Sequence, residues 1–92
     1  MPRPRKVVLR EVELETAEEA HERLAQKLGF PDFYGHNLDA LEDCLGDIDR
    51  PTRIVLERAN NSSESKTWFE SFVEVISESA QRSCYLGCTI RP

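Results

Sequence analysis

Six acidic side chains and no Lys or Arg occur in residues 32–49, DFYGHNLDALEDCLGDID. On a helix starting at residue 38, Asp39, Glu42 and Asp43 fall on one edge, about one turn apart. Like charges at this spacing destabilise a helix, so the pattern needs an explanation. Carboxylates so placed either contact only water, exchange protons with a substrate, or face a positively charged partner.

Catalysis by this stretch is disfavoured. Acid–base catalysis needs carboxylates in two different environments, whereas these share one exposed edge. Cys44 is an alternative nucleophile, with His36 nearby in sequence. However, Cys44 falls on the apolar arc with Leu41 and Leu45, so we expect it to be buried and unreactive. The sequence has no glycine-rich phosphate loop and no metal-ligand spacing.

The cysteines and histidines indicate no cofactor or metal. Cys44, Cys84 and Cys88 are too few and odd in number for a disulfide framework, and CYLGC is not a CxxC motif. His21 lies beside an apolar helical stripe without a Cys or His partner at helical spacing. We therefore expect His21 to be a packed core histidine, although a ligand role is the alternative.

The composition limits which kinds of partner the protein could bind and where in the cell it is expected. The net charge is −5, with 17 acidic and 12 basic residues, which argues against binding nucleic acid through its phosphates. The apolar runs are too short for a transmembrane helix, and the N-terminus lacks the features of a signal peptide. The expected protein is cytoplasmic, has no membrane or nucleic-acid partner, and is free to attract a basic protein.

The acidic helix is expected within a small α/β domain. Strands are predicted at 6–14, 53–57 and 84–90, with helices at 15–30, 38–46 and 67–82. Thr16 with Glu19 predicts the start of the first helix and Gly29 its end, and Asn37 is the expected N-cap of the second.

The order β-α-α-β-loop-α-β predicts three parallel strands, because helical crossovers join parallel strands. We expect one domain, residues 1–92 with 1–5 flexible: a three-stranded parallel sheet packed against three or four helices. Segment 58–66 is expected to be a polar loop. In the loop before residue 37, Gly35 is expected to adopt a backbone angle that other residues avoid. Phe33 and Tyr34 are expected to lie outside the core.

The sequence PDFYGHNLDALEDCLGDI resembles the signature of the barstar family, intracellular inhibitors of the secreted ribonuclease barnase. That signature is an aromatic pair, Gly, any residue, Asn-Leu-Asp-Ala-Leu, any residue, and Asp-Cys-Leu. A weaker resemblance extends over nearly the whole chain. The resemblance implies a barstar-like fold, and a helix and preceding loop that plug the basic cleft of a ribonuclease, with carboxylates replacing RNA phosphates.

The resemblance also implies the partner-binding residues. Asp43 would be the central anion, Asp39 a second anion, and Phe33 the ring that stacks on a catalytic histidine. The expected contacts are Phe33, Asn37, Leu38, Asp39, Glu42, Asp43, Gly46 and Glu78. Of these, Glu78 is equally explained as one of a row of acidic residues on the third helix that contact only water.

This chain differs from the family's best-known member at three positions. The best-known member has Tyr, Glu and Trp where this chain has Phe33, His36 and Glu42. Three functions therefore remain open. They are a bacterial ribonuclease inhibitor or immunity protein, monomeric when free and binding one-to-one; an acidic module for a basic partner that is not a nuclease; and a thiol enzyme based on Cys44.

Overall fold

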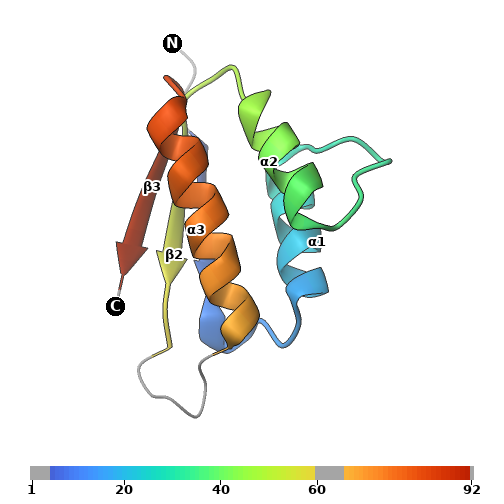
Figure 1. Cartoon of the computed structure of the whole chain (residues 1–92), viewed down its shortest axis with the longest axis vertical. Helices are drawn as coiled ribbons and strands as arrows, with labels where there is room; N and C mark the ends of the chain where they lie inside the picture. Colours follow the sequence, from blue (N-terminus) through green and yellow to red (C-terminus); the bar gives the residue numbers. More distant parts are fainter. Residues whose placement is uncertain (1–4, 60–65, 92) are drawn as a thin grey trace.

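The computed structural model describes residues 5–59 and 66–91. Along the chain, the elements are β1 (Arg5–Arg10), a one-turn 3-10 helix (Glu11–Glu13), α1 (Ala17–Leu28), α2 (Leu38–Gly46), β2 (Thr52–Glu57), α3 (Thr67–Arg82) and β3 (Leu86–Arg91) (Figure 1). None of these helices is long and apolar enough to cross a membrane.

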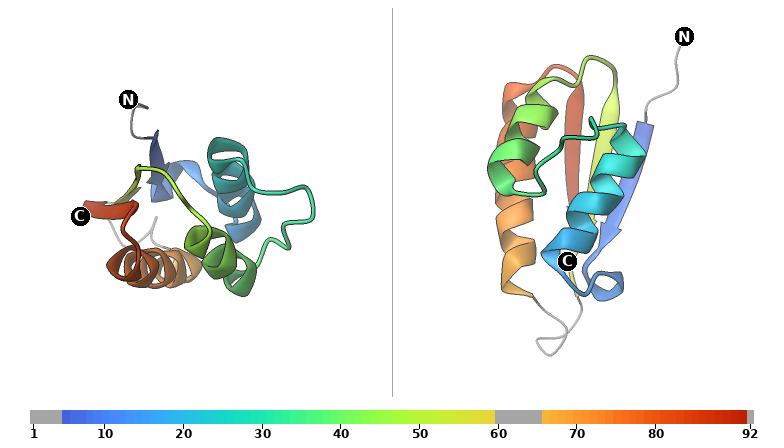
Figure 2. Two further views of the ribbon diagram at one scale, coloured as in Figure 1. Left: turned by 90° about the horizontal axis from the view of Figure 1, so that it is seen from above. Right: turned by 90° about the vertical axis from the view of Figure 1, so that its right-hand side faces the viewer.

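The three strands form one parallel sheet in the order β1-β2-β3. Both crossovers step across the sheet in the same direction, and right-handed connections then place their helices on the same face. Figure 2 shows α1, α2 and α3 together on one side of the sheet. The predicted α/β class and three-stranded parallel sheet are therefore confirmed, with three α-helices. A further helix in 58–66 would fall largely outside the described residues.

The core lies between the sheet and the helices. In β1 the buried residues Val7 and Leu9 alternate with more exposed ones. The central strand β2 instead buries Ile54, Val55 and Leu56 in succession. The helices contribute Leu24, Leu41, Leu45, Phe69, Phe72 and Ile76, all at most 1% exposed. α2 packs mainly against α3, so its other edge is available to solvent.

The local signals for helix ends are confirmed. The Glu19 N–H donates to Thr16 Oγ1 at 3.2 Å, and Gly29 ends α1 in the left-handed region at φ 70°. Asn37 Oδ1 accepts the Ala40 N–H at 2.8 Å and so caps the N-terminus of α2. These bonds satisfy backbone groups that a helix end otherwise leaves without partners.

The strand expected at 6–14 is shorter and shifted. Arg5, placed in the flexible end from sequence, is the first residue of β1 and pairs in register with Thr52. The strand ends at Arg10, because Glu11 turns inward and is only 2% exposed. Its carboxylate accepts the backbone N–H of Ala59 at 2.8 Å and also that of Lys66. The third strand likewise begins at Leu86 rather than residue 84.

Two expectations about the loop before α2 are wrong. Tyr34 belongs to the core, at 8% exposed, although its neighbour Phe33 is outside. The left-handed residue is His36, at φ 52°, and not Gly35. Gly35 is needed for space instead, since a Cβ there would lie 2.9 Å from the side-chain nitrogen of Asn37. That nitrogen donates to the Gly35 carbonyl, so a larger residue would disturb the cap of α2.

Candidate partner-binding surface

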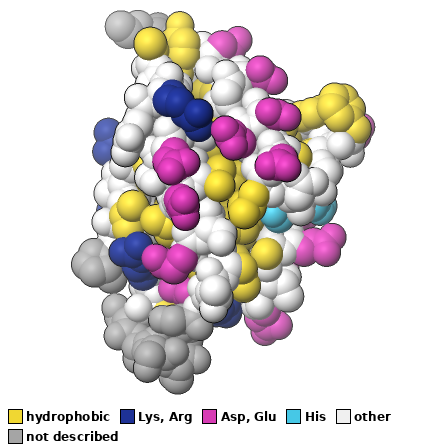
Figure 3. Space-filling view, viewed as in Figure 1, with side chains coloured by type: hydrophobic (Ala, Val, Ile, Leu, Met, Phe, Trp, Pro, Cys, Tyr) yellow, Lys and Arg dark blue, Asp and Glu magenta, His cyan; other side chains and the backbone are white. Residues whose placement is uncertain are grey.

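α2 separates an apolar edge from an acidic edge. Leu41 and Leu45 are fully buried, while Asp39, Glu42 and Asp43 are exposed on the opposite side. Figure 3 shows Asp and Glu side chains gathered over α2 and α3 on one face of the molecule. We call Asp39, Glu42 and Asp43 the acidic edge. The helix that carries these carboxylates is capped and packed on α3, so their backbone positions are fixed before any partner arrives.

The loop before α2 carries an exposed aromatic ring on a buried anchor. The Phe33 side chain is 89% exposed, which is rare for a ring of this size. Tyr34 is its anchor, with the hydroxyl 2.6 Å from Nδ1 of the buried His21 and its ring against Phe30. Burial raises the pKa of Tyr34, and so does the nearby Cys44, so its hydroxyl keeps its proton. Phe33 therefore projects from a loop tied to the core.

Phe33 and Asp43 line the same hollow, which lies between the loop and the second half of α2. This loop hollow has a volume of about 450 Å³. Phe30, Cys44 and Ile48 contribute apolar surface. The remaining charged residues that line it are of both signs: Arg5, Asp47, Asp49 and Arg50. The hollow thus combines an exposed aromatic ring with charged groups of both signs.

A second hollow lies between α2 and the turn from α3 to β3. This turn hollow has a volume of about 560 Å³ and is lined by Glu42, Asp43, Gly46, Arg82 and Tyr85, among others. Arg82 Nη2 lies 3.2 Å from the Glu42 carboxylate, so α3 supplies a cation that α2 lacks. A Cβ on Gly46 would meet no atom within 4 Å, so the helix backbone is open to close approach there.

The residues singled out from sequence fall into three groups. Asp43 lines both hollows and joins Phe33 on one side to Glu42 and Gly46 on the other. Asn37, Leu38 and Asp39 occupy the N-terminal end of α2, outside the lining of either hollow. Glu78 is exposed on α3, also outside that lining.

Sequence reasoning missed Arg82 and Tyr85. Tyr85 was placed in a strand, but it lies in the turn before β3 and is 48% exposed in the wall of the turn hollow. Arg82 is 40 residues from Glu42, and nothing local to either residue signals their contact. The ring of His36 faces α1 rather than the acidic edge, which the sequence did not indicate.

Cys44 has the environment of an unreactive thiol. It is half-buried rather than fully buried as expected, and it lines the loop hollow. Burial raises the pKa of the Cys44 thiol, and the neighbouring Asp47 and Asp43 raise it further. Since the thiolate is the nucleophile, these neighbours suppress reactivity at neutral pH.

Fold and surface place the chain among small α/β proteins that present an acidic, aromatic-edged face to solvent. The chain belongs to the Barstar family: the family description "Barstar (barnase inhibitor)" is matched over residues 5–86. It is also 40% identical over 80 residues to the "Putative ribonuclease inhibitor YrdF" of Bacillus subtilis (strain 168), covering 86% of this chain and 85% of that protein. Membership indicates an inhibitor rather than an enzyme.

Proposed function

We propose that this protein inhibits a ribonuclease by inserting the acidic edge of α2 and the ring of Phe33 into its active-site cleft. The observation that carries the proposal is that Phe33 and Asp43 line one hollow beside the acidic edge. Asp43 is the central anion, Asp39 and Glu42 flank it, and Gly46 lets the enzyme approach the helix. Asn37 and Leu38 supply backbone contacts at the N-terminal end, and Glu78 adds a carboxylate from α3.

The chemistry of an RNA-cleaving site explains why such a surface would inhibit. Cationic side chains in that cleft bind phosphates, and a carboxylate offers them a similar charge and hydrogen-bond acceptors. Repulsion within the acidic edge makes free α2 less stable, and a cationic cleft relieves that repulsion on binding. Opposite net charges also accelerate encounter between the −5 chain and a basic enzyme.

Family membership and the inhibitor name of the Bacillus relative support the same function. The proposed partner is a basic ribonuclease that is secreted or acts as a toxin, bound one-to-one by a monomeric, cytoplasmic immunity protein. The surface excludes water from the cleft without any chemistry of its own, so no cofactor is required.

A second candidate is a module for a basic partner that is not a nuclease. Two observations favour it: Glu42 is already paired with Arg82, and His36 is turned toward α1. At both positions the best-known member of the family has a different residue type. A surface altered there could have exchanged one basic partner for another, while Asp43 and Phe33 kept the same geometry.

The first test is inhibition of RNA cleavage by barnase and by a panel of other small basic ribonucleases. We expect inhibition of at least one enzyme, with Asp43→Asn weakening it at least thirtyfold, about 2 kcal/mol. The matched control is Glu15→Gln, which removes one negative charge before the start of α1. No inhibition by the folded protein across the panel would favour the second candidate. Equal effects of the two substitutions would mean that the surface is misplaced.

A further inference from the structure

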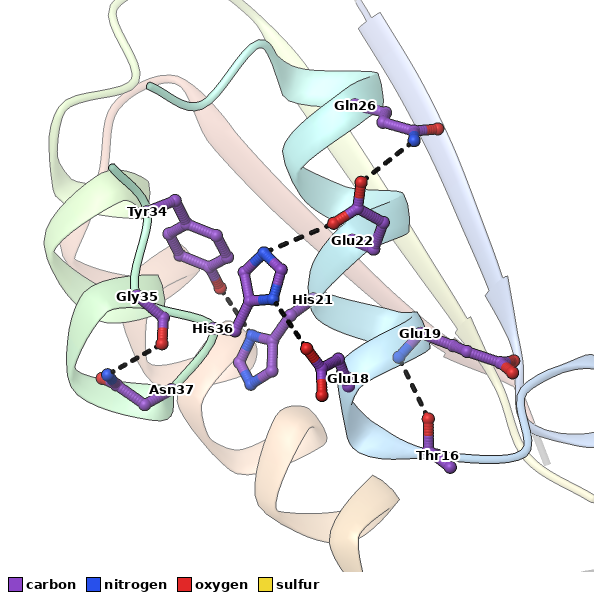
Figure 4. A network of polar contacts seen from close by, with 10 residues as sticks. All are labelled: Thr16, Glu18, Glu19, His21, Glu22, Gln26, Tyr34, Gly35, His36 and Asn37. Atoms are coloured by element: carbon purple, nitrogen blue, oxygen red, sulfur yellow. Dashed lines mark hydrogen bonds and ion pairs between the residues drawn. The ribbon is translucent and has the colours of Figure 1, made fainter. Parts of the chain in front are cut away.

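The ring of His36 lies between two carboxylates of α1 (Figure 4). Its Nδ1 is 3.4 Å from Glu18 Oε1, and its Nε2 is 3.4 Å from Glu22 Oε2. Glu18 and Glu22 are one helical turn apart and would repel each other without a cation between them. A neutral imidazole has one N–H and satisfies one carboxylate, whereas the protonated ring donates to both. His36 therefore bridges two carboxylates of α1 and contacts each through a different ring nitrogen.

The backbone of His36 has a cost that its side chain must offset. At φ 52° the residue is left-handed, a conformation that is unfavourable for a side chain with a Cβ. Gly35, which could adopt it freely, has an ordinary φ instead. Strained backbone persists where surrounding contacts determine it. Here those contacts are the two carboxylates and the rings of Tyr34 and His21.

His21 completes the cluster but carries no charge at neutral pH. Its ring is parallel to that of His36, with centroids 6.1 Å apart. Burial lowers the pKa of His21, and repulsion from His36 lowers it further. A neutral His21 can accept the Tyr34 hydroxyl, so the loop is tied to α1 twice: once through Tyr34 inside and once through His36 outside. Phe33 lies on the same loop, immediately before Tyr34.

We propose that His36 is a positioning residue whose protonated ring clamps the loop onto Glu18 and Glu22 and thereby presets Phe33 for the partner. The clamp is weaker when the ring is neutral, because only one of its two nitrogens then carries a proton to donate. The titratable groups around this ring are Glu18, His21 and Glu22 of α1, and Asp32 and Tyr34 of its own loop.

The clamp differs from an ordinary surface ion pair because it affects binding more than folding stability. Exposed pairs contribute little to global stability, and Glu18 is 79% exposed. A loop that is ordered only part of the time, however, binds with its intrinsic affinity multiplied by the fraction of time that it is ordered. A modest interaction at His36 thus acts on binding more than on folding. The link to affinity depends on the proposed function, whereas the link to loop order does not.

The test compares the free protein with His36→Asn and with the double variant Glu18→Gln/Glu22→Gln. Asn tolerates a left-handed φ and carries no charge, so His36→Asn should fold. The control is Glu15→Gln/Glu74→Gln, which removes two charges from exposed positions away from the clamp. Amide hydrogen-exchange protection of Tyr34, whose N–H donates to the Pro31 carbonyl at 2.9 Å, is measured from pH 5.5 to 7.5 and corrected for the intrinsic exchange rate.

We expect protection to fall about fivefold with rising pH in the wild type and the control. In His36→Asn and Glu18→Gln/Glu22→Gln it should be low and independent of pH. Persistence of the pH dependence in His36→Asn would assign it to another group, such as His21, and overturn the proposal. A wild type without pH dependence would overturn it as well.

Binding to barnase provides the second measurement. The ratio of the Kd of His36→Asn to that of the wild type at each pH cancels the titration of the enzyme. This ratio should be about fivefold at pH 5.5 and approach one at pH 7.5. A ratio that stays at one overturns the coupling to affinity. If no ribonuclease binds at any pH, the proposed function fails, while the exchange data still support or overturn the clamp.

Discussion

The hydroxyl of Tyr34 lies 2.6 Å from Nδ1 of His21, and this buried bond joins the loop before α2 to the core. The His21 ring also packs on Phe72 of α3, with centroids 4.6 Å apart. One side chain of α1 therefore links the loop to the helix that supports α2. The protonation state of His21 therefore affects the contacts that hold the candidate surface in place.

Stability should decrease as the pH falls below neutral, because of His21. Burial lowers the pKa of His21 in the folded protein, whereas an unfolded histidine keeps a value of about 6.5. The unfolded chain therefore binds a proton that the native protein excludes, and protonation favours unfolding. The contribution of neutral His21 is complete above pH ~6.5 and is lost as the pH drops below it.

Urea unfolding at pH 7.5, 6.5 and 5.5 measures this effect. In His21→Gln the side chain does not titrate and still carries an amide for the Tyr34 hydroxyl, so the loss of stability toward pH 5.5 should be smaller than in the wild type. The same slope in both would show that His21 does not govern the pH dependence.

Glu11 should be one of the most sensitive polar positions in the fold. Its buried carboxylate accepts backbone N–H groups of Ala59 and Lys66, and the Lys66 ammonium donates to its carbonyl at 2.9 Å. Glu11→Gln places an amide NH₂ where a carboxylate oxygen accepts, leaving a buried donor without an acceptor. The expected loss is about 2–3 kcal/mol in the free energy of unfolding.

The matched control for Glu11 is Glu13→Gln in the same short helix. Glu13 forms exposed ion pairs with Arg10 and Arg23, so its loss should change stability by less than ~1 kcal/mol. Equilibrium denaturation of both variants gives the comparison. Similar losses would mean that the buried hydrogen bonds of Glu11 add nothing beyond a surface charge.

Local sequence signals predicted the elements that local bonds determine. Asn37 and Gly29 predicted helix ends, because their own side chain or backbone conformation satisfies the terminal groups. The order of the elements predicted the parallel sheet, because a helical crossover leaves few alternatives. The separation of Leu41 and Leu45 from the acidic edge followed from helical periodicity in the same way.

Contacts between distant segments were not predictable from local patterns. Glu11 binds Ala59 across 48 residues, and Glu42 binds Arg82 across 40. Both depend on how packed elements meet, which is why residues 11–14 were assigned to a strand and Arg82 was overlooked. The left-handed backbone conformation, expected at Gly35 but found at His36, has a similar origin. Tertiary contacts to α1 determine which residue is left-handed, although glycine has the greater intrinsic freedom.

Arg82 should reduce the rate at which a basic ribonuclease associates. It places a cation beside the acidic edge, 3.2 Å from Glu42, and both side chains are at least half exposed. Arg82→Ala should leave the free energy of unfolding within ~1 kcal/mol. It should raise the association rate about two- to threefold at 50 mM salt, because the surface becomes more negative.

Stopped-flow association at 50 and 500 mM salt measures this effect, with Arg23→Ala on α1 as the charge-matched control. The advantage of Arg82→Ala should disappear at high salt, where exposed charges are screened. A slower association of Arg82→Ala would instead show that Arg82 contacts an acidic group of the enzyme. In that case Arg82 belongs to the interface.

The three thiols should react in a definite order in the native protein. Cys84 is exposed in the wall of the turn hollow, whereas burial raises the pKa of Cys88 and of Cys44. Asp47 and Asp43 further disfavour the Cys44 thiolate. A disulfide reagent at pH 7.5 should therefore modify Cys84 first, and Cys44 and Cys88 at least tenfold more slowly, since the thiolate is the reacting species.

Mass spectrometry of the labelled peptides distinguishes the three sites. Unfolding in urea should abolish the difference, because the pKa shifts arise from the folded environment. Rapid native labelling of Cys44 would contradict its environment and revive a thiol enzyme as the function. Protection of Cys44 until unfolding would leave the acidic edge and Phe33 as the functional groups of this surface. Prior incubation with a bound ribonuclease should slow Cys44 further, since the loop hollow that it lines would be covered.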